Sequence, residues 1–222
     1  MVDWLGRRKQ ARYPIVVPIL YGPERSDLVV ANAGWTRDLS EGGACVELSE
    51  RLQASVLIRL LLRTDQGSIA TQGQVIWVEG PLPTGGILHG VAFDRMVSTQ
   101  QQAMREFLLR RRMVWRAVVR IPLELPVIYQ LKGQSRSLHQ GQTENVSRRG
   151  LLLRLPLVYS PGTLLEVTLH TPHGHLGAEG TIVRVEPLEA QIPGKPIRHG
   201  FHFTNISHET QTTLGRVLAE AR

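Results

Sequence analysis

RKQARYP, at residues 8–14, recurs 108 residues later as RAVVRIP at residues 116–122. DLSEGG, at residues 38–43, recurs 107 residues later as NVSRRG at residues 145–150. The first stretch keeps two arginines at positions i and i+4 ahead of a proline. The second keeps an acid or amide two residues before a serine, with a glycine three residues further on. The two halves therefore carry the same signals in the same order.

Two further landmarks extend the repeat toward the end of each half. Gly73 with VE at residues 78–79 recurs as Gly180 with VE at residues 185–186. HGVAF at residues 89–93 recurs 110 residues later as HGFHF. The period is far longer than that of a solenoid repeat, so each copy is expected to be a whole domain. We expect a first domain at residues 1–111 and a second at residues 112–222.

Each half is a series of short apolar segments rich in Val, Ile and Leu. Gly, Pro, Asp and Ser separate them, which is typical of strands joined by turns. In the first half the expected strands are residues 15–21, 28–37, 44–49, 55–63, 67–78 and 87–95. Six strands at roughly ten-residue spacing favour an antiparallel barrel.

A helix is expected after the strands of each half. Ser98 or Thr99 can cap the first helix, and an apolar face of that helix is formed by Met104, Phe107 and Leu108. Ser207 can cap the second, whose apolar residues are Leu214, Val217 and Leu218. The predicted fold is mainly β, with two tandem six-stranded antiparallel barrels, each followed by a C-terminal α-helix.

The arginine pair ahead of the Asp/Asn-x-Ser-x-x-Gly turn resembles the signature of the PilZ domain family, and it occurs twice. The resemblance covers nearly the whole chain. It implies six-stranded barrels that bind cyclic di-GMP. It assigns that ligand to Arg7, Arg8, Arg12, Asp38, Ser40 and Gly43 in the first copy, and to Arg116, Arg120, Asn145, Ser147 and Gly150 in the second.

The chemistry of these residue types fits such a ligand independently of the resemblance. Guanidinium groups form forked, charge-assisted hydrogen bonds to phosphate or to guanine O6 and N7, and they stack on purines. Asp38 can accept from the guanine N1–H and N2–H₂ edge, whereas Asn145 lacks the charge and is expected to hold that edge less well. Ser40 and Ser147 can contact phosphate or hold the turn, and local turn formation alone could also explain both motifs.

Two departures from symmetry accompany the arginine pairs. Arg7 precedes the first pair and Trp115 precedes the second. By the resemblance, the first copy is expected to hold a stacked pair of ligand molecules and the second is not. The second pair also lies in the linker, together with Arg110–Arg112 at the end of the first helix, where cations favour the helix dipole. Ligand there is expected to change the arrangement of the two barrels.

The net charge of +7 predicts affinity for an anionic partner. Only three of the 26 basic residues are lysines, which either reflects a GC-rich genome or suits phosphate and guanine recognition. No segment is long and apolar enough to span a membrane, and the N-terminus lacks the pattern of a signal peptide. A cytoplasmic location is expected.

Other features are assigned structural roles. Cys45 is expected to be small and buried, and Trp77 to pack in the core rather than to floor a base-stacking surface. The cluster His170, His173 and His175 is expected to form an exposed turn rather than a metal site. No motif of a nucleophilic, metal-dependent or dinucleotide-dependent enzyme is present, so neither catalysis nor a cofactor is expected.

The primary hypothesis is a receptor that binds cyclic di-GMP and signals to a protein partner. One alternative is a nucleic-acid-binding regulator with the messenger as effector; the lack of a helix-turn-helix pattern weighs against it. Another is a protein-interaction adaptor whose ligand sites are vestigial.

Overall fold

The computed structural model describes residues 11–23, 32–83, 85–113, 117–134, 137–187 and 194–221. The chain divides into two compact units, Met1–Val119 and Arg120–Arg222. The division falls after the first helix because the backbone of Val16 bonds to residues 117 and 119 (Val16 N to Ala117 O, 2.7 Å; Val119 N to Val16 O, 3.0 Å). This short parallel bridge keeps residues 117–119 with the first unit.

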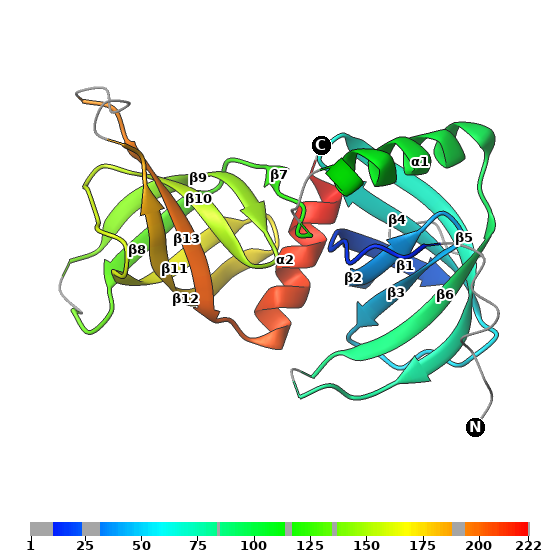
Figure 1. Ribbon diagram of the computed structural model, residues 1–222. Helices are drawn as coiled ribbons and strands as arrows, with labels where there is room; N and C mark the ends of the chain where they lie inside the picture. The colour runs from blue at the N-terminus through cyan, green and yellow to red at the C-terminus, as the bar shows by residue number, and fades with distance from the viewer. Residues whose placement is uncertain are drawn as a thin grey trace. The chain divides into compact units, whose positions relative to one another are not determined.

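The first unit is a closed antiparallel barrel followed by a helix (Figure 1). Its elements are β1 (Pro18–Pro23), β2 (Asn32–Ser40), β3 (Gly43–Leu48), β4 (Leu57–Thr64), β5 (Gly67–Glu79), β6 (Ile87–Arg95) and α1 (Ser98–Met113). The strands follow the order β1-β2-β3-β6-β5-β4, and pairing of β1 with β4 closes the barrel. In β4, Ile58, Leu60 and Leu62 are buried while the residues between them are more exposed, as expected when alternate side chains fill a barrel.

Helix α1 covers the β4–β5 hairpin of the first barrel. Its buried residues are Met104, Phe107 and Leu108, which confirms the predicted apolar face. Gln100 Oε1 accepts from the backbone N–H of Ala70 at 2.9 Å, near the start of the helix. Arg111 pairs with Asp65 at 2.6 Å near its end. Polar contacts at both ends therefore fix the helix along the hairpin.

The second unit repeats the architecture. Its elements are β7 (Ile121–Pro122), β8 (Pro126–Leu131), β9 (His139–Ser147), β10 (Gly150–Leu155), β11 (Leu164–Thr171), β12 (Gly174–Val185), β13 (Ile197–Asn205) and α2 (His208–Glu220). Six strands close in the order β9-β10-β13-β12-β11-β8, and the short β7 adds to β9. Ser207 caps α2 by accepting from Thr210 N at 3.0 Å, as predicted. Leu214, Val217 and Leu218 are buried.

The predicted strands agree with the structure except at their ends. β1 begins at Pro18 rather than residue 15, because residues 13 and 16 make only isolated bridges. β2 begins at Asn32, and the earlier part of the predicted second strand lies outside the described residues. α1 ends at Met113, so residues 110–112 lie in its last turn, as predicted.

Two buried polar contacts recur at matching positions in both barrels. Thr36 Oγ1 accepts from Val17 N at 2.9 Å and donates to Ile15 O at 2.7 Å. Thr143 makes the same pair of bonds with Leu125 N and Leu123 O. Each threonine thereby fastens the lead-in segment to its barrel, and buried backbone groups there are satisfied.

A buried histidine recurs in the same way. His89 Nε2 accepts from Leu52 N at 3.0 Å, and His199 Nε2 accepts from Tyr159 N at 3.1 Å. The Nδ1 of each ring lies within hydrogen-bonding distance of the carbonyl of Ile87 or Ile197. Both side chains are fully buried, and burial lowers the pKa of both imidazoles. Each histidine is thus held neutral as an acceptor for a loop N–H.

Candidate ligand-binding site

The first arginine motif and the first Asp-x-Ser turn meet in the structure. Arg12 Nη1 lies 2.9 Å from Asp38 Oδ1, and each side chain is about a third exposed. The same carboxylate oxygen accepts from Cys45 N at 3.2 Å. Asp38 is thereby fixed in position, and both charged groups still face solvent where a ligand could reach them.

The backbone explains why Arg12 reaches Asp38. Tyr13 N donates to Leu39 O, and Leu39 N donates to Tyr13 O, both at 2.9 Å. This isolated antiparallel bridge holds the lead-in arm against β2, one residue from each member of the ion pair. Arg7 and Arg8 lie outside the described residues.

Ser40 and Gly43 form the turn between β2 and β3. The buried Ser40 hydroxyl donates to Gly43 O at 3.1 Å. A Cβ on Gly43 would collide with the carbonyl oxygen of Val91, so the close approach of β3 and β6 requires glycine here. Ser147 donates to Gly150 O at 3.0 Å in the same way, and a Cβ on Gly150 would meet Phe201 O. Of the two roles considered for these serines, the structure shows the turn-forming one.

Four strands bring distant residues into a single transverse row. Asp38 on β2 pairs in register with Cys45 on β3, Cys45 with Gly90 on β6, and Gly90 with Trp77 on β5. The two middle residues are small, so the row forms a trough between the Asp38 carboxylate on β2 and the strand β5 that carries Trp77. We call it the first row.

The indole lies across the trough floor because of a β-bulge. The register of β5 against β6 shifts between Val75 and Trp77, which leaves Ile76 as the extra residue. A Cβ on Gly90 would overlap the indole, so the ring lies directly over the glycine. Bulges commonly re-aim a side chain next to a binding site.

Trp77 corrects the sequence prediction. The residue is half-buried and lines a pocket, whereas it was expected in the core. Trp35, by contrast, is buried. The sequence signal was available in Gly90, which belongs to a repeated motif, but only the register shows that this glycine faces Trp77.

A pocket of about 780 Å³ lies over the first row. Its lining includes Arg12, Asp38, Cys45, Trp77 and Gly90. The volume falls in the range of about 300–1,000 Å³ that is typical of small-molecule sites. The pocket therefore combines a cation, an anion and an aromatic face within one concavity of the first unit.

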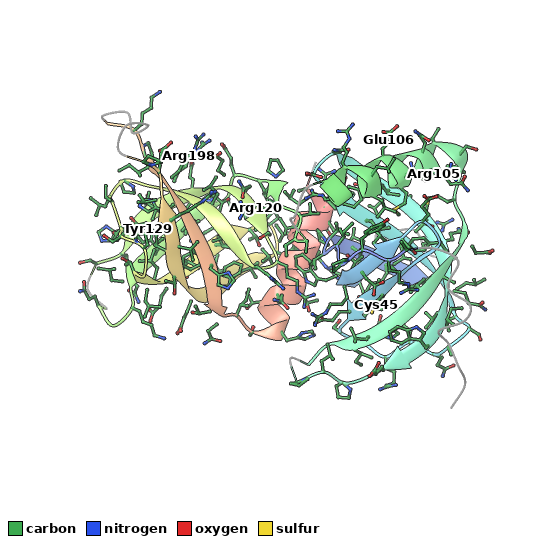
Figure 2. The ribbon with its side chains drawn as sticks, viewed as in Figure 1. Cys45, Arg105, Glu106, Arg120, Tyr129 and Arg198 are labelled. Atoms are coloured by element: carbon green, nitrogen blue, oxygen red, sulfur yellow. The ribbon has the colours of Figure 1, made fainter. Side chains whose placement is uncertain are left out.

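Cys45, labelled in Figure 2, lies on the first barrel. It lines this pocket with a small side chain. Its side chain is buried, as predicted. Burial, together with the nearby Asp38 charge, raises the pKa of the thiol to about 11. The thiol stays protonated at neutral pH, so it is a poor nucleophile.

The second unit builds an equivalent row with different residues. Asn145 on β9 pairs with Leu152 on β10, Leu152 with Gly200 on β13, and Gly200 with Arg184 on β12. A register shift between Ile182 and Arg184 matches the bulge before Trp77. We call this the second row.

The second arginine motif lies beside the second row. Arg120, labelled in Figure 2, is exposed and precedes β7. Ile121 and Pro122 of β7 pair with Val146 and Asn145 of β9. The lead-in and the amide turn are thus neighbours, as they are in the first unit. Arg116 lies outside the described residues.

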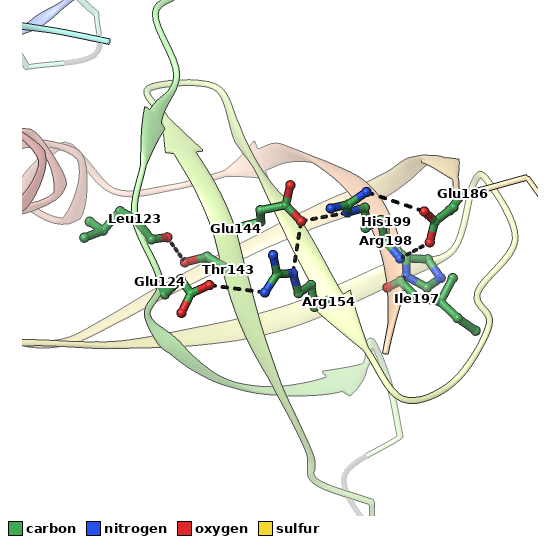
Figure 3. A network of polar contacts seen from close by, with 9 residues as sticks. All are labelled: Leu123, Glu124, Thr143, Glu144, Arg154, Glu186, Ile197, Arg198 and His199. Atoms are coloured by element: carbon green, nitrogen blue, oxygen red, sulfur yellow. Dashed lines mark hydrogen bonds and ion pairs between the residues drawn. The ribbon is translucent and has the colours of Figure 1, made fainter. Parts of the chain in front are cut away.

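An ion pair lies beside each row, and the positions of its acidic and basic residues are exchanged between the two units. Arg37, the bulged residue of β2, pairs with the buried Glu47 at 2.7 Å. At the matching positions Glu144 pairs with Arg154 at 3.0 Å, and Glu144 also accepts from Arg198 at 2.7 Å (Figure 3). Burial alone would raise the pKa of Glu144, but the two guanidinium groups lower it below its ordinary value.

The histidine cluster forms a hairpin turn. His170 and His175 face each other across β11 and β12 with ring centroids 4.3 Å apart, and His173 pairs with Glu220 at 2.5 Å. Among the described residues, no three His, Cys, Asp or Glu side chains gather closely enough to hold a metal ion. Within the same part of the chain, neither helix has the length and hydropathy needed to cross a membrane.

One protein family matches this chain. A model of the PilZ domain matches residues 6–110 and again residues 111–220. A search of curated proteins finds no match.

Several solved structures are similar to this chain at low sequence identity. The inhibitor of motility MotI/DgrA from Bacillus subtilis is 11% identical, with 92% of this chain and 94% of that chain covered and a TM-score of 0.39. YcgR from Escherichia coli, solved in complex with c-di-GMP, is 11% identical over 91% and 82% of the chains, with a TM-score of 0.38. K. pneumonia MrkH, described as a c-di-GMP-dependent transcription regulatory factor, is 12% identical over 91% and 83%, with a TM-score of 0.36.

Proposed function

Because this chain belongs to the PilZ domain family and carries two copies in tandem, we propose that it is a receptor for cyclic di-GMP. The observation that carries the proposal is the convergence of Arg12 and Asp38 on a pocket floored by Trp77. We propose a binding protein rather than a catalyst, located in the cytoplasm and acting through a protein partner.

Each group of the first row suits one part of a cyclic diguanylate. The Arg12 guanidinium can form a fork with phosphate or with guanine O6 and N7. The Asp38 carboxylate is an acceptor for the paired donors on the guanine Watson–Crick edge. The Trp77 ring offers an apolar face on which a purine can stack.

The ion pair between Arg12 and Asp38 keeps both groups in place before ligand arrives. Each side chain is about a third exposed, so exchanging this contact for ligand contacts costs little, since exposed ion pairs are worth only about 0–1 kcal/mol. The site is therefore preorganised, and binding energy is not spent on assembling it.

Titration calorimetry of the full chain with cyclic di-GMP tests this function. Arg12→Ala and Asp38→Ala should each weaken binding at the first row by tenfold or more, because each removes a charge-assisted contact. Arg120→Ala tests the second copy in the same way. Arg105→Ala is the matched control, since Arg105 forms an exposed ion pair with Glu41 and is not part of the lining named for the first row.

The expected result is heat from the wild type, of which the part that belongs to the first row is lost in Arg12→Ala and kept in Arg105→Ala. An absence of heat from the wild type would contradict the receptor function, and a protein-interaction adaptor with vestigial ligand sites would then be the remaining hypothesis. Equal binding by Arg12→Ala and wild type would remove the first row from the ligand site.

The net charge of +7 supports a second candidate function, a nucleic-acid-binding regulator with the messenger as effector. Fluorescence polarisation with a labelled DNA duplex across a range of salt concentrations discriminates the two. Affinity that falls steeply with salt and ignores sequence would indicate only phosphate attraction.

A further inference from the structure

The lead-in segment of the first barrel is bonded on both of its edges. On the inner edge, Thr36 bonds to Ile15 O and Val17 N. Val16 lies between them, and its own backbone groups point to the outer edge, because alternate residues of an extended chain direct their N–H and C=O to opposite sides. There Val16 N donates to the carbonyl of residue 117 at 2.7 Å, and Val16 O accepts from the N–H of residue 119 at 3.0 Å. The outer edge of the first lead-in is thus occupied by a parallel extended segment.

The lead-in segment of the second barrel is bonded on the inner edge alone. Thr143 bonds to Leu123 O and Leu125 N, so Glu124 is the counterpart of Val16 (Figure 3). Within the residues that the structure describes, nothing bonds to the backbone N–H or C=O of Glu124. Its side chain is 66% exposed. We call this open position the outer edge of Glu124.

An open edge is a backbone template for another strand. Closed barrels leave no such edge, because every strand has a neighbour on each side. The lead-in lies beside β9 and outside the closed barrel, so the outer edge of Glu124 escapes this protection. Addition of an extended segment to such an edge is a common mode of protein recognition. The first unit shows that this chain uses it.

The repeat indicates which segment suits the outer edge of Glu124. Residues 117–119 belong to the stretch RAVVRIP, which repeats RKQARYP at a spacing of 108 residues. The counterpart of residues 117–119 is therefore residues 9–11, of which 9 and 10 lie outside the described residues. In the first unit the added segment is the one that leads into another barrel. A second copy of this chain supplies such a segment ahead of its own first barrel.

The charges of the two partners are complementary. In the first unit the facing residues are apolar, Val16 and Val118. In the second unit the edge residue is the acidic Glu124, and residues 7–12 (RRKQAR) carry four cations and no anion. Glu124 also pairs with Arg154 at 3.1 Å, but that pair is exposed and therefore weak. We call residues 7–12 the basic arm.

We propose that the outer edge of Glu124 binds the basic arm of a second copy of this chain as a parallel strand. Glu124 N donates to the carbonyl of residue 9, and Glu124 O accepts from the N–H of residue 11, as Val16 does with residues 117 and 119. The contact joins the second unit of one copy to the arm of the next. Such a head-to-tail contact is heterologous, so it leads to open chains of copies unless a ring closes.

Sedimentation velocity of the full chain without ligand, from micromolar to millimolar protein, tests this contact. The average mass should rise with concentration past that of a dimer, and added salt should reverse the rise because the arm and Glu124 carry opposite charges. Glu124→Pro removes the outward N–H and should raise the concentration at half-association by fivefold or more. Glu124→Lys should have the same effect by repulsion.

A charge exchange tests the register. Gln10 is expected to face Glu124 as Val118 faces Val16, so Gln10→Glu places two carboxylates opposite each other and should weaken association by fivefold or more. Gln10→Glu combined with Glu124→Lys should return it to within twofold of the wild type. Glu209→Lys is the matched control, because it makes the same charge change at an exposed position in the first turn of α2.

The outcomes separate this inference from the proposed function, because no cyclic di-GMP is present. A wild type that stays monomeric, growth that stops at a dimer, or a charge exchange that restores nothing would overturn the contact and leave the receptor function standing. Thermal melting of each variant shows that it remains folded. If Glu124→Pro fails to fold, Glu124→Lys and the charge exchange still decide.

Discussion

At the scale of the residue, the most informative side chain is Trp77, since one bulge turns it from the expected core onto the pocket floor. Trp77→Ala is expected to weaken cyclic di-GMP binding by roughly tenfold or more, because base–aromatic stacking contributes about 1–3 kcal/mol per base. Trp77→Phe keeps an aromatic face and should retain most of the affinity. Calorimetry on the three proteins checks this, and equal affinities would show that no base stacks on the indole.

The buried histidines give a prediction about pH. Burial lowers the pKa of His89 and His199 below the ordinary 6.5. Between the folded and unfolded pKa values the unfolded chain binds more protons, so the stabilisation is complete above about pH 6.5 and is lost as pH falls below it. Each histidine can contribute a slope of at most about 1.4 kcal/mol per pH unit.

Urea unfolding between pH 5 and 8 measures this slope. His89→Gln should flatten the pH dependence of the first unit, because the amide can still accept from Leu52 N but does not titrate in this range. His202→Gln changes an exposed strand residue and serves as the control. A slope that is the same in His89→Gln and wild type would contradict the assignment.

At the scale of the element, the two barrels share backbone devices while their charges differ. The bridge at Tyr13–Leu39 matches β7 on β9, and the bulges before Trp77 and Arg184 match each other. The pair Arg37–Glu47, by contrast, is reversed as Glu144–Arg154. Strand pairing is set by backbone hydrogen bonds, which tolerate exchange of outward-facing charges as long as each pair stays complementary.

The turn glycine of β3 gives a prediction about stability. Gly43→Ala should destabilise the first unit by about 1–3 kcal/mol, because its Cβ would push into the Val91 carbonyl of the neighbouring strand. Gly177→Ala is the matched control, since a Cβ there meets nothing within 4 Å. Chemical denaturation compares the two variants, and equal stabilities would show that β3 and β6 can separate without cost.

At the scale of the whole molecule, the arm that carries Arg12 also holds the segment leading into the second unit. Val16 bonds to residues 117 and 119, immediately before Arg120. In the proposed function, ligand held by Arg12 would therefore act on the same arm that bonds to residues 117 and 119. A ligand changes the arrangement of two units only if it binds one arrangement better than another.

Small-angle scattering tests this coupling. We expect the scattering profile of the full chain to change on addition of saturating cyclic di-GMP. The double variant Arg12→Ala and Arg120→Ala, given the same ligand, should keep the ligand-free profile. Identical profiles of the wild type with and without ligand would count against a rearrangement.

The sequence by itself determined the features that depend on local pattern. The duplicated motifs gave two domains of one kind, alternation and turn residues gave the strands, and the apolar faces around Phe107 and Leu218 gave the helices. These signals are readable because burial of alternate or helically spaced side chains is a short-range regularity. The Arg12–Asp38 pair was also predictable, because the same spacing occurs twice.

Only the tertiary structure decided which residues lie beside the Arg12–Asp38 pair. Cys45, Gly90 and Trp77 are far apart along the chain and become neighbours through strand register. A one-residue bulge decides whether Trp77 faces the core or the pocket, and no local pattern records it. The same register places Arg184 where the first barrel has an indole, because side chains that touch across a sheet are chosen by pairing and not by sequence distance.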